Sequence, residues 1–460
     1  MAARDSVPAF VAPASSHDDA IVVREQPKLD LDLYIQNYVG RTRFDRLLFI
    51  GKTCPPLCVD ALKAAILEAK QGPDVTRYME AWDCIRLAAP GEPEAQRDQA
   101  WIDRIEAENK AELSRLEAEL KGYKNNLIKE SIRMGHEDLG KHLENTGKLQ
   151  EALEAYGRMR QDVSTTKHII DCGKHLANVS LQRHDWSTAL SAMSKTAGVH
   201  GGDFGESPHA FIKIVSGISH LGMGHYDDAA QFFLQADFAE PPSKYAHIAS
   251  PNDVAIYGGL TALATMERQD LQQRVLDNHA FRMFLEHEPH LRKAISLFIN
   301  GRYTSCLSIL ESARPDYLLD YRIHKHIPAI YSKIRTKCIV QYCEPFSRVT
   351  IASLDAAFGQ PGQSMKPELV EMIRDGLLKA RIDAKNGLLV AARPDPRVEM
   401  QNEVLDVTHK YEQEAKERLR RINLVAAGLE HVGNKKQTTD ESWWDYVKNL
   451  GQEGGAPGES

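Results

Sequence analysis

The residues best suited to chemistry are two histidines separated by one residue, His324 and His326. Histidine pairs at this spacing supply imidazole ligands to zinc in metal-dependent isopeptidases and other hydrolases. Such a site also needs a serine and an aspartate at fixed distances downstream. Here Ser332 follows too closely, and no aspartate follows before Asp355. We therefore interpret the pair as an accident of a helix surface, with a cryptic hydrolase as an alternative.

The seven cysteines form neither a metal site nor a disulfide framework by their spacing. Cys54 and Cys58 lack a second ligand pair, and the other five are no better placed. We expect all seven to be buried small hydrophobic residues or unreactive thiols. Gly258-Gly259 follows no strand and precedes no lysine, so it indicates close helix packing and not a phosphate loop. The sequence predicts no catalytic residue, no cofactor and no metal ligand.

Composition and charge narrow the class of protein. At 460 residues, with 42% hydrophobic and 26% charged residues, the chain is typical of a globular protein of about three domains. Its net charge of −7 gives no basic field to attract nucleic acid or a membrane. No apolar run approaches the roughly 20 residues that span a bilayer, and no secretory signal is recognisable. We expect an intracellular protein.

A helical-repeat pattern begins at Gly135. Leu139-Gly140, Ala152 and Tyr156 occupy the offsets of tetratricopeptide repeats, in which small residues lie where two antiparallel helices touch. The pattern recurs at intervals of about 40 residues. Later members start at Asp185, Tyr226 and, in degenerate form, Gly301. Because one helical hairpin cannot bury its own apolar face, we expect the hairpins to stack into a right-handed solenoid.

The repeats lead through a predicted helix, Asp320 to Tyr342, into a winged-helix pattern of helix, turn, helix and hairpin. The first helix is predicted from apolar residues at helical spacing: Val349, Ile351, Leu354 and Phe358. After a break at 359–362, the second begins near Pro367 with the apolar stripe Leu369, Met372, Ile373 and Leu377. Asn386-Gly387, between two apolar runs, predicts a hairpin with a type I′ turn.

The charge of the second predicted helix indicates which class of partner it can bind. A DNA reader needs cations facing phosphate, but this helix carries Glu368, Glu371 and Asp375 against Arg374 alone. The outer strand of the wing is instead an open edge that another chain could extend. The pattern favours protein assembly over nucleic-acid binding.

Two long helices are predicted outside the repeats. Residues from Trp101 to Met134 read as one helix, without proline and with a single glycine. The second, in 397–430, carries an apolar stripe at steps of three and four residues. The stripe includes Val404, Val407, Tyr411, Leu419 and Ile422. This helix either packs back on the wing or bundles with helices of other chains.

The predicted fold is all-α with a small β wing: a right-handed helical-repeat solenoid, a winged-helix domain and a C-terminal helix. We place a disordered N-terminus at 1–27, an N-terminal helical region at 28–134, the repeats at 135–320, the winged helix at 321–396, the C-terminal helix at 397–430 and a disordered tail at 431–460. In the tail, Trp443-Trp444 suggests either a short docking motif or a patch that folds back on the body.

Several motifs resemble a known family. Helical repeats that run into a winged helix and a terminal helix are the layout of the PCI family, found in the proteasome lid, the COP-nine signalosome and translation initiation factor three. Residues 38–55, 123–140, 250–260 and 372–392 resemble the signalosome members most closely. The resemblance spans residues 30–430.

The resemblance implies a non-catalytic scaffold of the cytoplasm and nucleus. Signalosomes remove a ubiquitin-like modifier from cullins (deneddylation) and so regulate cullin–RING ubiquitin ligases; the isopeptidase site lies in another subunit. The implied partners are other PCI subunits, metalloisopeptidase-fold subunits and cullin–RING ligases, with no nucleic acid and no membrane. The implied interface residues are Arg381, Ile382, Leu388, Leu389, Val390, Tyr411, Leu419 and Ile422.

Two alternatives stay open beside the hydrolase. One is the equivalent PCI subunit of the proteasome lid, which shares the layout but is disfavoured by the 38–54 motif. The other is a helical-repeat regulator that binds nucleic acid.

Overall fold

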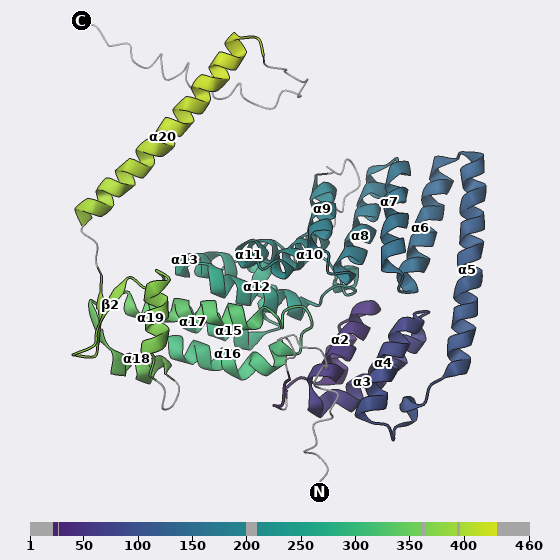
Figure 1. Ribbon diagram of the computed structural model, residues 1–460, viewed down its shortest axis with the longest axis horizontal. Coiled ribbons are helices and arrows are strands. Elements are labelled where there is room, and N and C mark those ends of the chain that lie inside the picture. Colours follow the sequence, from purple (N-terminus) through teal and green to yellow (C-terminus); the bar gives the residue numbers. More distant parts are fainter. Residues whose placement is uncertain (1–21, 26, 199–208, 360–363, 393–395, 430–460) are drawn as a thin grey trace, which may run out of the picture. The chain divides into compact units, whose positions relative to one another are not determined.

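The computed structural model describes residues 22–25, 27–198, 209–359, 364–392 and 396–429. They fall into two compact units, with the boundary between Ala391 and Ala392. The described residues are mainly helical, with one small three-stranded sheet (Figure 1), so the predicted fold class is confirmed. The predicted tail at 431–460, with Trp443-Trp444, lies outside the described residues. Most of the segment 1–27 does too, but Val23 is described and buried, and its N–H donates to the Thr53 carbonyl.

The first helices form a hydrophobic core of their own. Asp30 and Asp74 cap two of them by accepting backbone N–H groups of the first turn. The apolar faces enclose side chains such as Phe44, Ile50 and Leu62, and Leu319 joins this core from far along the chain. The helices are α1 (Leu31–Gln36), α2 (Arg41–Thr53), α3 (Cys58–Gln71) and α4 (Val75–Ala88).

The predicted single helix from Trp101 to Met134 is wrong. Two helices occupy the segment, α5 (Gln99–Asn126) and α6 (Lys129–Asn145). Leu127 ends α5 in the left-handed conformation, with φ of 54°, and the chain reverses there. Gly135 of α6 then lies against Leu120 of α5. Neither proline nor glycine marks this reversal, so helix-breaker signals could not reveal it.

The repeat region consists of the antiparallel helices expected from its small-residue spacing (Figure 1). A Cβ on Gly140 would lie 2.5 Å from the Tyr156 ring, and one on Gly217 would lie 2.8 Å from Phe233. Each glycine therefore lets its helix approach the next closely. After α6, the helices are α7 (Leu149–Met159), α8 (Thr166–Gln182), α9 (Trp186–Ala197), α10 (His209–Gly222) and α11 (Tyr226–Leu234).

A second group of helices follows. Ser250 and Asp253 form a reciprocal capping box at the start of α12, and Gly258 and Gly259 pack closely against Phe281 and Leu291, as expected. The predicted helix from Asp320 begins instead at Ile327. The helices are α12 (Pro251–Thr265), α13 (Arg268–Asp270), α14 (His279–Leu285), α15 (Pro289–Ile299), α16 (Tyr303–Leu318) and α17 (Ile327–Cys343).

The winged helix shares one continuous core with the repeats, which runs from Ala177 to Leu389. Its elements are β1 (Arg348–Thr350), α18 (Ile351–Phe358), α19 (Lys366–Arg374), β2 (Ala380–Asp383) and β3 (Leu388–Ala391). The strands are antiparallel in the order β1-β3-β2. Val349 therefore lies in a strand, and its prediction as a helical residue is wrong. Val349 is nevertheless buried. Over a strand of three residues, the spacing of one buried side chain fits a helix as well as a strand.

The wing turn also differs from the prediction. Asp383 pairs with Leu388, so the loop has four residues, 384–387, and not two. Gly387 has φ of 65°, but Asn386 is not in the left-handed region, which excludes a type I′ turn centred on the pair. Asp383 closes the loop by accepting the backbone N–H groups of Lys385 and Asn386.

The second helix of the winged helix is shorter than predicted. It ends at Arg374, where Gly376 turns the chain with φ of 74° and the Leu377 N–H donates back to the Met372 carbonyl. Leu377 is consequently 54% exposed, and Leu378 takes the buried position in its place.

The second unit contributes one described helix, α20 (Pro396–Ala426). Its ion pairs run along its own surface, such as Lys416 with Glu412 and Arg421 with Glu417.

Candidate assembly surface

The strands of the wing divide the predicted interface residues between two faces. One face carries Val390 of β3, with Arg348 of β1 and Arg381 of β2 directly opposite it on either side. Leu388, two residues before Val390 on the same strand, lies on the same face. Leu389 and Ile382 lie on the other face; Leu389 is 3% exposed, and Ile382 packs against the core. Arg381, Leu388 and Val390 are therefore accessible, whereas Leu389 and Ile382 hold the sheet to its own helices.

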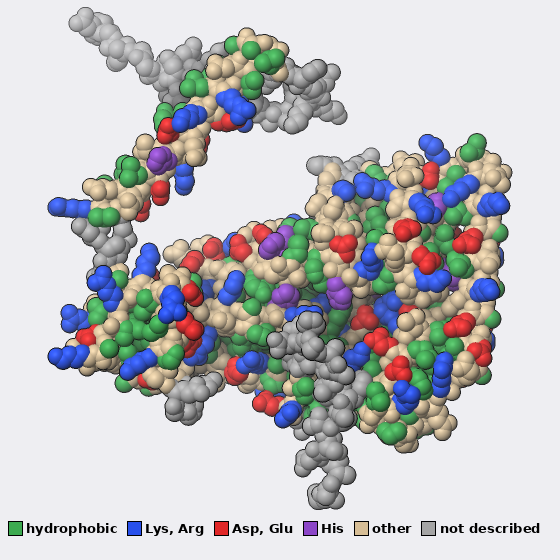
Figure 2. Space-filling model, in the orientation of Figure 1, with side chains coloured by type: hydrophobic (Ala, Val, Ile, Leu, Met, Phe, Trp, Pro, Cys, Tyr) green, Lys and Arg blue, Asp and Glu red, His purple; other side chains and the backbone are tan. Residues whose placement is uncertain are grey.

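The outer face of the wing is rich in cations. Lys and Arg side chains gather over the winged helix in Figure 2. The exposed cations there are Arg348, Lys366, Arg374, Lys379, Arg381 and Lys385. Arg348 and Arg381 flank the apolar Val390 across the sheet, an arrangement complementary to an acidic partner with an apolar centre.

The sheet leaves β2 as an edge strand. Because β3 lies between β1 and β2, no strand among the described residues pairs with the outer side of β2. Its unpaired backbone groups are available to a strand of another chain. The adjoining turn is held by Asp383, whose pKa is lowered by hydrogen bonds from Asn386 and Lys385.

The helix α19 does not resemble a DNA-reading helix in this structure. Glu371 and Asp375 are exposed, and Glu368 is held by Arg335 at 2.7 Å. Lys366 and Arg374 at the two ends of α19 are offset by Glu371 and Asp375, so this segment offers no net positive charge to a phosphate backbone.

The helix α20 exposes the large apolar residues of its predicted stripe. Tyr411 is 74% exposed, Val407 65%, Ile422 61% and Leu419 60%. Large apolar residues elsewhere in the described chain are mostly buried, so this stripe is a candidate interface. Figure 2 shows apolar side chains interspersed with charged ones along α20.

The histidine pair lies in a turn and not at a helix surface, with His324 buried and His326 half-buried. His324 is 8% exposed, with Nδ1 3.2 Å from the Asp320 carbonyl, and His326 has Nδ1 3.2 Å from the Tyr226 hydroxyl. Burial lowers the pKa of both rings. Both lie in the turn before α17 and belong to no metal-like group in the described part of the chain. The seven cysteines are all free and buried, as predicted.

Sequence reasoning missed a buried charged centre at Arg46. This side chain is 1% exposed; its guanidinium lies 2.7 Å from Asp253 and 3.0 Å from Asp320, over the Tyr38 ring. The Tyr257 hydroxyl donates to Asp320 at 2.5 Å. Burial opposes charge on Asp320, but Arg46 and Tyr257 outweigh it and lower the pKa of that carboxyl. Arg46 lies in the 38–55 motif and Asp253 in the 250–260 motif, both of which carried the family resemblance. Their place in these motifs was the one indication in the sequence that the two residues could be linked.

None of the described helices combines the length and the apolar character needed to cross a membrane.

Comparison with known proteins matches two family models to the chain. Residues 98–274 match the 26S proteasome subunit RPN7 model, and residues 305–393 match the PCI domain model. The second match covers the winged helix and the two helices that precede it.

Curated relatives match most of the chain. COP9 signalosome complex subunit 1 of Neurospora crassa is 49% identical over 398 residues, which is 86% of this chain and 90% of the relative. Its namesake in Arabidopsis thaliana is 36% identical and covers 86% of this chain and 90% of the relative. The 26S proteasome non-ATPase regulatory subunit 6 of rice is 23% identical over 73% of this chain and 84% of the relative. The chain thus belongs to the family of COP9 signalosome complex subunit 1, within the PCI-domain proteins.

Proposed function

We propose that this chain is a non-catalytic scaffold of a COP9 signalosome in the cytoplasm and nucleus. In this proposal it positions other PCI and metalloisopeptidase-fold subunits, so that the assembled complex removes the ubiquitin-like modifier from cullins and regulates cullin–RING ligases. Isopeptidase chemistry belongs to another subunit. The family assignment favours this role over a place in the proteasome lid.

The observation that carries the proposal is the exposed stripe of α20. Burying one such Leu, Ile or Val side chain against a partner contributes about 1.5–3 kcal/mol. Burial of the whole stripe would therefore contribute a large favourable free energy to association. A helix of 31 residues with this pattern suits a bundle with helices of other chains.

The outer face of the wing supplies a second contact. Its exposed β2 edge offers backbone hydrogen bonds, and Arg381 and Arg348 flank an apolar centre at Val390. Edge pairing fixes the register between two chains, while the arginines select a partner with acidic groups opposite them.

The test of assembly uses the tagged full-length chain in cells. Replacing Tyr411 and Ile422 together with Asp should abolish recovery of partner subunits, because two charges would enter the middle of a buried helical seam. The matched control replaces Glu414 and Glu417 with Ala and should leave recovery unchanged. These glutamates form ion pairs with Arg418 and Arg421 along the surface of α20. The measurement is quantitative mass spectrometry of the co-purified chains.

Three results would contradict the proposal. Unchanged recovery with the double Asp variant would remove α20 from assembly. Co-purification of proteasome-lid chains in place of signalosome chains would assign the protein to the lid. Salt-dependent DNA binding by the purified protein at physiological ionic strength would favour a nucleic-acid regulator.

A further inference from the structure

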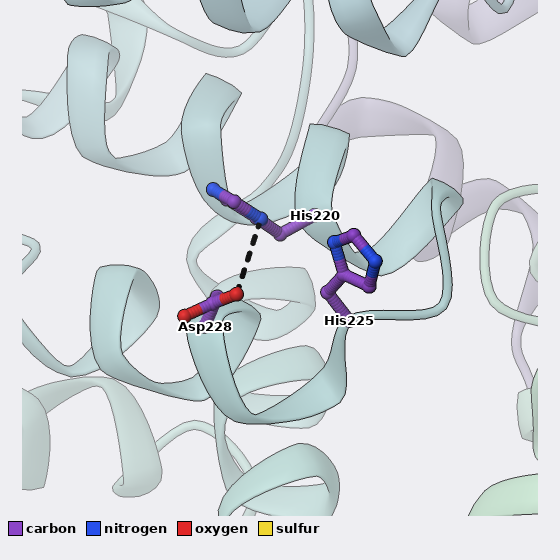
Figure 3. Close-up of side chains that lie close together, drawn as sticks. All are labelled: His220, His225 and Asp228. Carbon is purple, nitrogen blue, oxygen red and sulfur yellow. Dashed lines mark ion pairs between the residues drawn. The ribbon is translucent and has the colours of Figure 1, made fainter.

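Three side chains with metal-binding atoms converge at the turn between α10 and α11. His220 lies near the end of α10, His225 immediately precedes α11, and Asp228 lies in its first turn (Figure 3). One ligand atom from each of the three lies within 4.8 Å of the others, and no other group of three or more His, Cys, Asp or Glu in the described ranges meets this condition.

His220 anchors the group. Its ring stacks on Phe232 at 5.1 Å between centroids and 13° between planes, which fixes its direction. Its Nδ1 is buried and has no hydrogen-bond partner among the described residues; the Asp228 carboxylate lies 3.8 Å away, beyond hydrogen-bonding distance (Figure 3). A buried polar atom left without a partner is costly, and here it faces a carboxylate across a gap that an ion could bridge.

The other two ligands face solvent. His225 is exposed, and the Asp228 side chain is 55% exposed. Both can therefore change rotamer at little cost, while His220 stays fixed. Ligand atoms no more than 4.8 Å apart need to move by less than about 1 Å to reach the zinc–ligand distances of about 2.0–2.2 Å.

We propose that His220, His225 and Asp228 bind a divalent transition-metal ion of the zinc class. Two imidazoles with one carboxylate suit zinc and its neighbours, whereas calcium and magnesium prefer oxygen ligands alone. Because His225 and Asp228 reach the surface, the fourth ligand is water, and the ion is open to exchange with solvent.

The ion would act as a cross-link inside the repeat region. The ligands come from two successive antiparallel helices, so an ion holds the end of α10 to the start of α11. Binding to the folded chain and not to the unfolded one stabilises the fold by mass action. This role is independent of His324 and His326, which contribute no ligand to the group.

The test titrates the metal-free, full-length protein with Zn²⁺ by calorimetry and with Co²⁺ by visible absorption. The wild type should bind one ion in this group and show the absorption of nitrogen- and oxygen-bound Co²⁺. His220→Ala and His225→Ala should each weaken binding at least about tenfold, since even the loss of a supporting outer-shell group costs about 10–100-fold. Asp228→Asn should weaken it as well. Zn²⁺ should raise the melting temperature of the wild type but not of His220→Ala.

Two control variants separate this site from other histidines. His409→Ala removes an exposed histidine of α20 and should bind as the wild type does. The double variant of His324 and His326 to Gln tests the other histidine pair and should also keep the ion. The proposal is overturned if the wild type binds no ion more tightly than His220→Ala/His225→Ala, or if ion binding is lost only with the His324 and His326 variant. Because His225 is exposed, His225→Ala keeps the test valid even if His220→Ala unfolds.

Discussion

At the scale of single residues, the Arg46 centre joins parts of the chain that are distant in sequence. Arg46 belongs to α2, whereas Asp253 opens α12 and Asp320 precedes α17. Two carboxylates share one guanidinium, and the hydroxyls of Tyr38 and Tyr257 donate to Asp253 and Asp320. Such a buried network favours one docking geometry, because removal of any member leaves the others without partners.

Replacing Arg46 with Met should destabilise the protein by about 3–5 kcal/mol, because Asp253 and Asp320 would be left buried without a counter-charge. Urea unfolding at pH 7 measures the change. Lys52→Met on the same helix removes an exposed ion pair with Glu80 and should cost less than about 1 kcal/mol. Adding Asp253→Asn and Asp320→Asn to Arg46→Met should restore part of the loss; no restoration would show that the charges are not the cause.

Glu288 should make stability depend on pH. Burial raises its pKa from 4.5 to about 7, against the hydrogen bond from Asn252, and Asp253 and Asp316 add to the rise. His290 lies 3.3 Å away. Between pH 4.5 and 7 the folded chain holds a proton that the unfolded chain has lost, so the free energy of unfolding falls as pH rises through this window.

Replacing Glu288 with Gln removes this penalty. The variant should be more stable than the parent at pH 8 by about 1–3 kcal/mol, at about 1.4 kcal/mol per pKa unit, and equal to it near pH 4. Urea unfolding at the two pH values provides the comparison. A variant with the parent's slope between them would contradict the assignment.

At the scale of elements, closely packed helix pairs explain why the repeat pattern uses glycine. Gly140 lies where α6 meets the Tyr156 ring of α7, and the Tyr156 hydroxyl in turn donates to Glu144 at 2.9 Å. A larger residue at this position displaces the ring and disturbs that hydrogen bond.

Gly140→Val should therefore destabilise the chain by about 1–3 kcal/mol or more through overpacking. Gly122→Ala on α5 is the matched control: its added methyl group meets nothing within 4 Å, and alanine should stabilise the helix by about 0.5–1 kcal/mol. Thermal unfolding followed by circular dichroism distinguishes the two. Equal melting temperatures for the two variants would mean that the helices adjust without cost.

At the scale of the whole molecule, the chain divides between a large packed unit and α20. The core from Ala177 to Leu389 runs through the later repeats and the winged helix without interruption.

A chain that ends at Ala391 should keep the thermal midpoint of the full-length protein, because the core of the first unit remains whole. Its partner subunits should nevertheless be lost on purification. Calorimetry of the truncated and full-length chains, each purified alone, checks the first expectation. A lower midpoint for the truncated chain would show that α20 also stabilises the first unit.

The fold and the candidate surface differed in how far the sequence predicted them. Repeat spacing placed Gly140 against Tyr156, because small and large residues must alternate where two helices touch. The turn at Leu127 and the strand at Val349 were missed, because no breaker residue precedes the first and the second has only three residues. The loop at Asn386-Gly387 was expected to have two residues, but capping by Asp383 favours four.

The sequence by itself determined the helical class, the repeats, the buried cysteines and the family, because these follow from periodicity, composition and motifs local to the chain. Only the tertiary structure decided which wing residues face outward, that His324 is buried and His326 half-buried, and that Arg46 meets Asp253 and Asp320. The convergence of His220, His225 and Asp228 likewise depends on the angle at which two helices meet. Periodicity shows which face of a helix or strand is apolar, but it does not show which other element packs against that face. The packing partner is fixed by contacts between residues far apart in the chain.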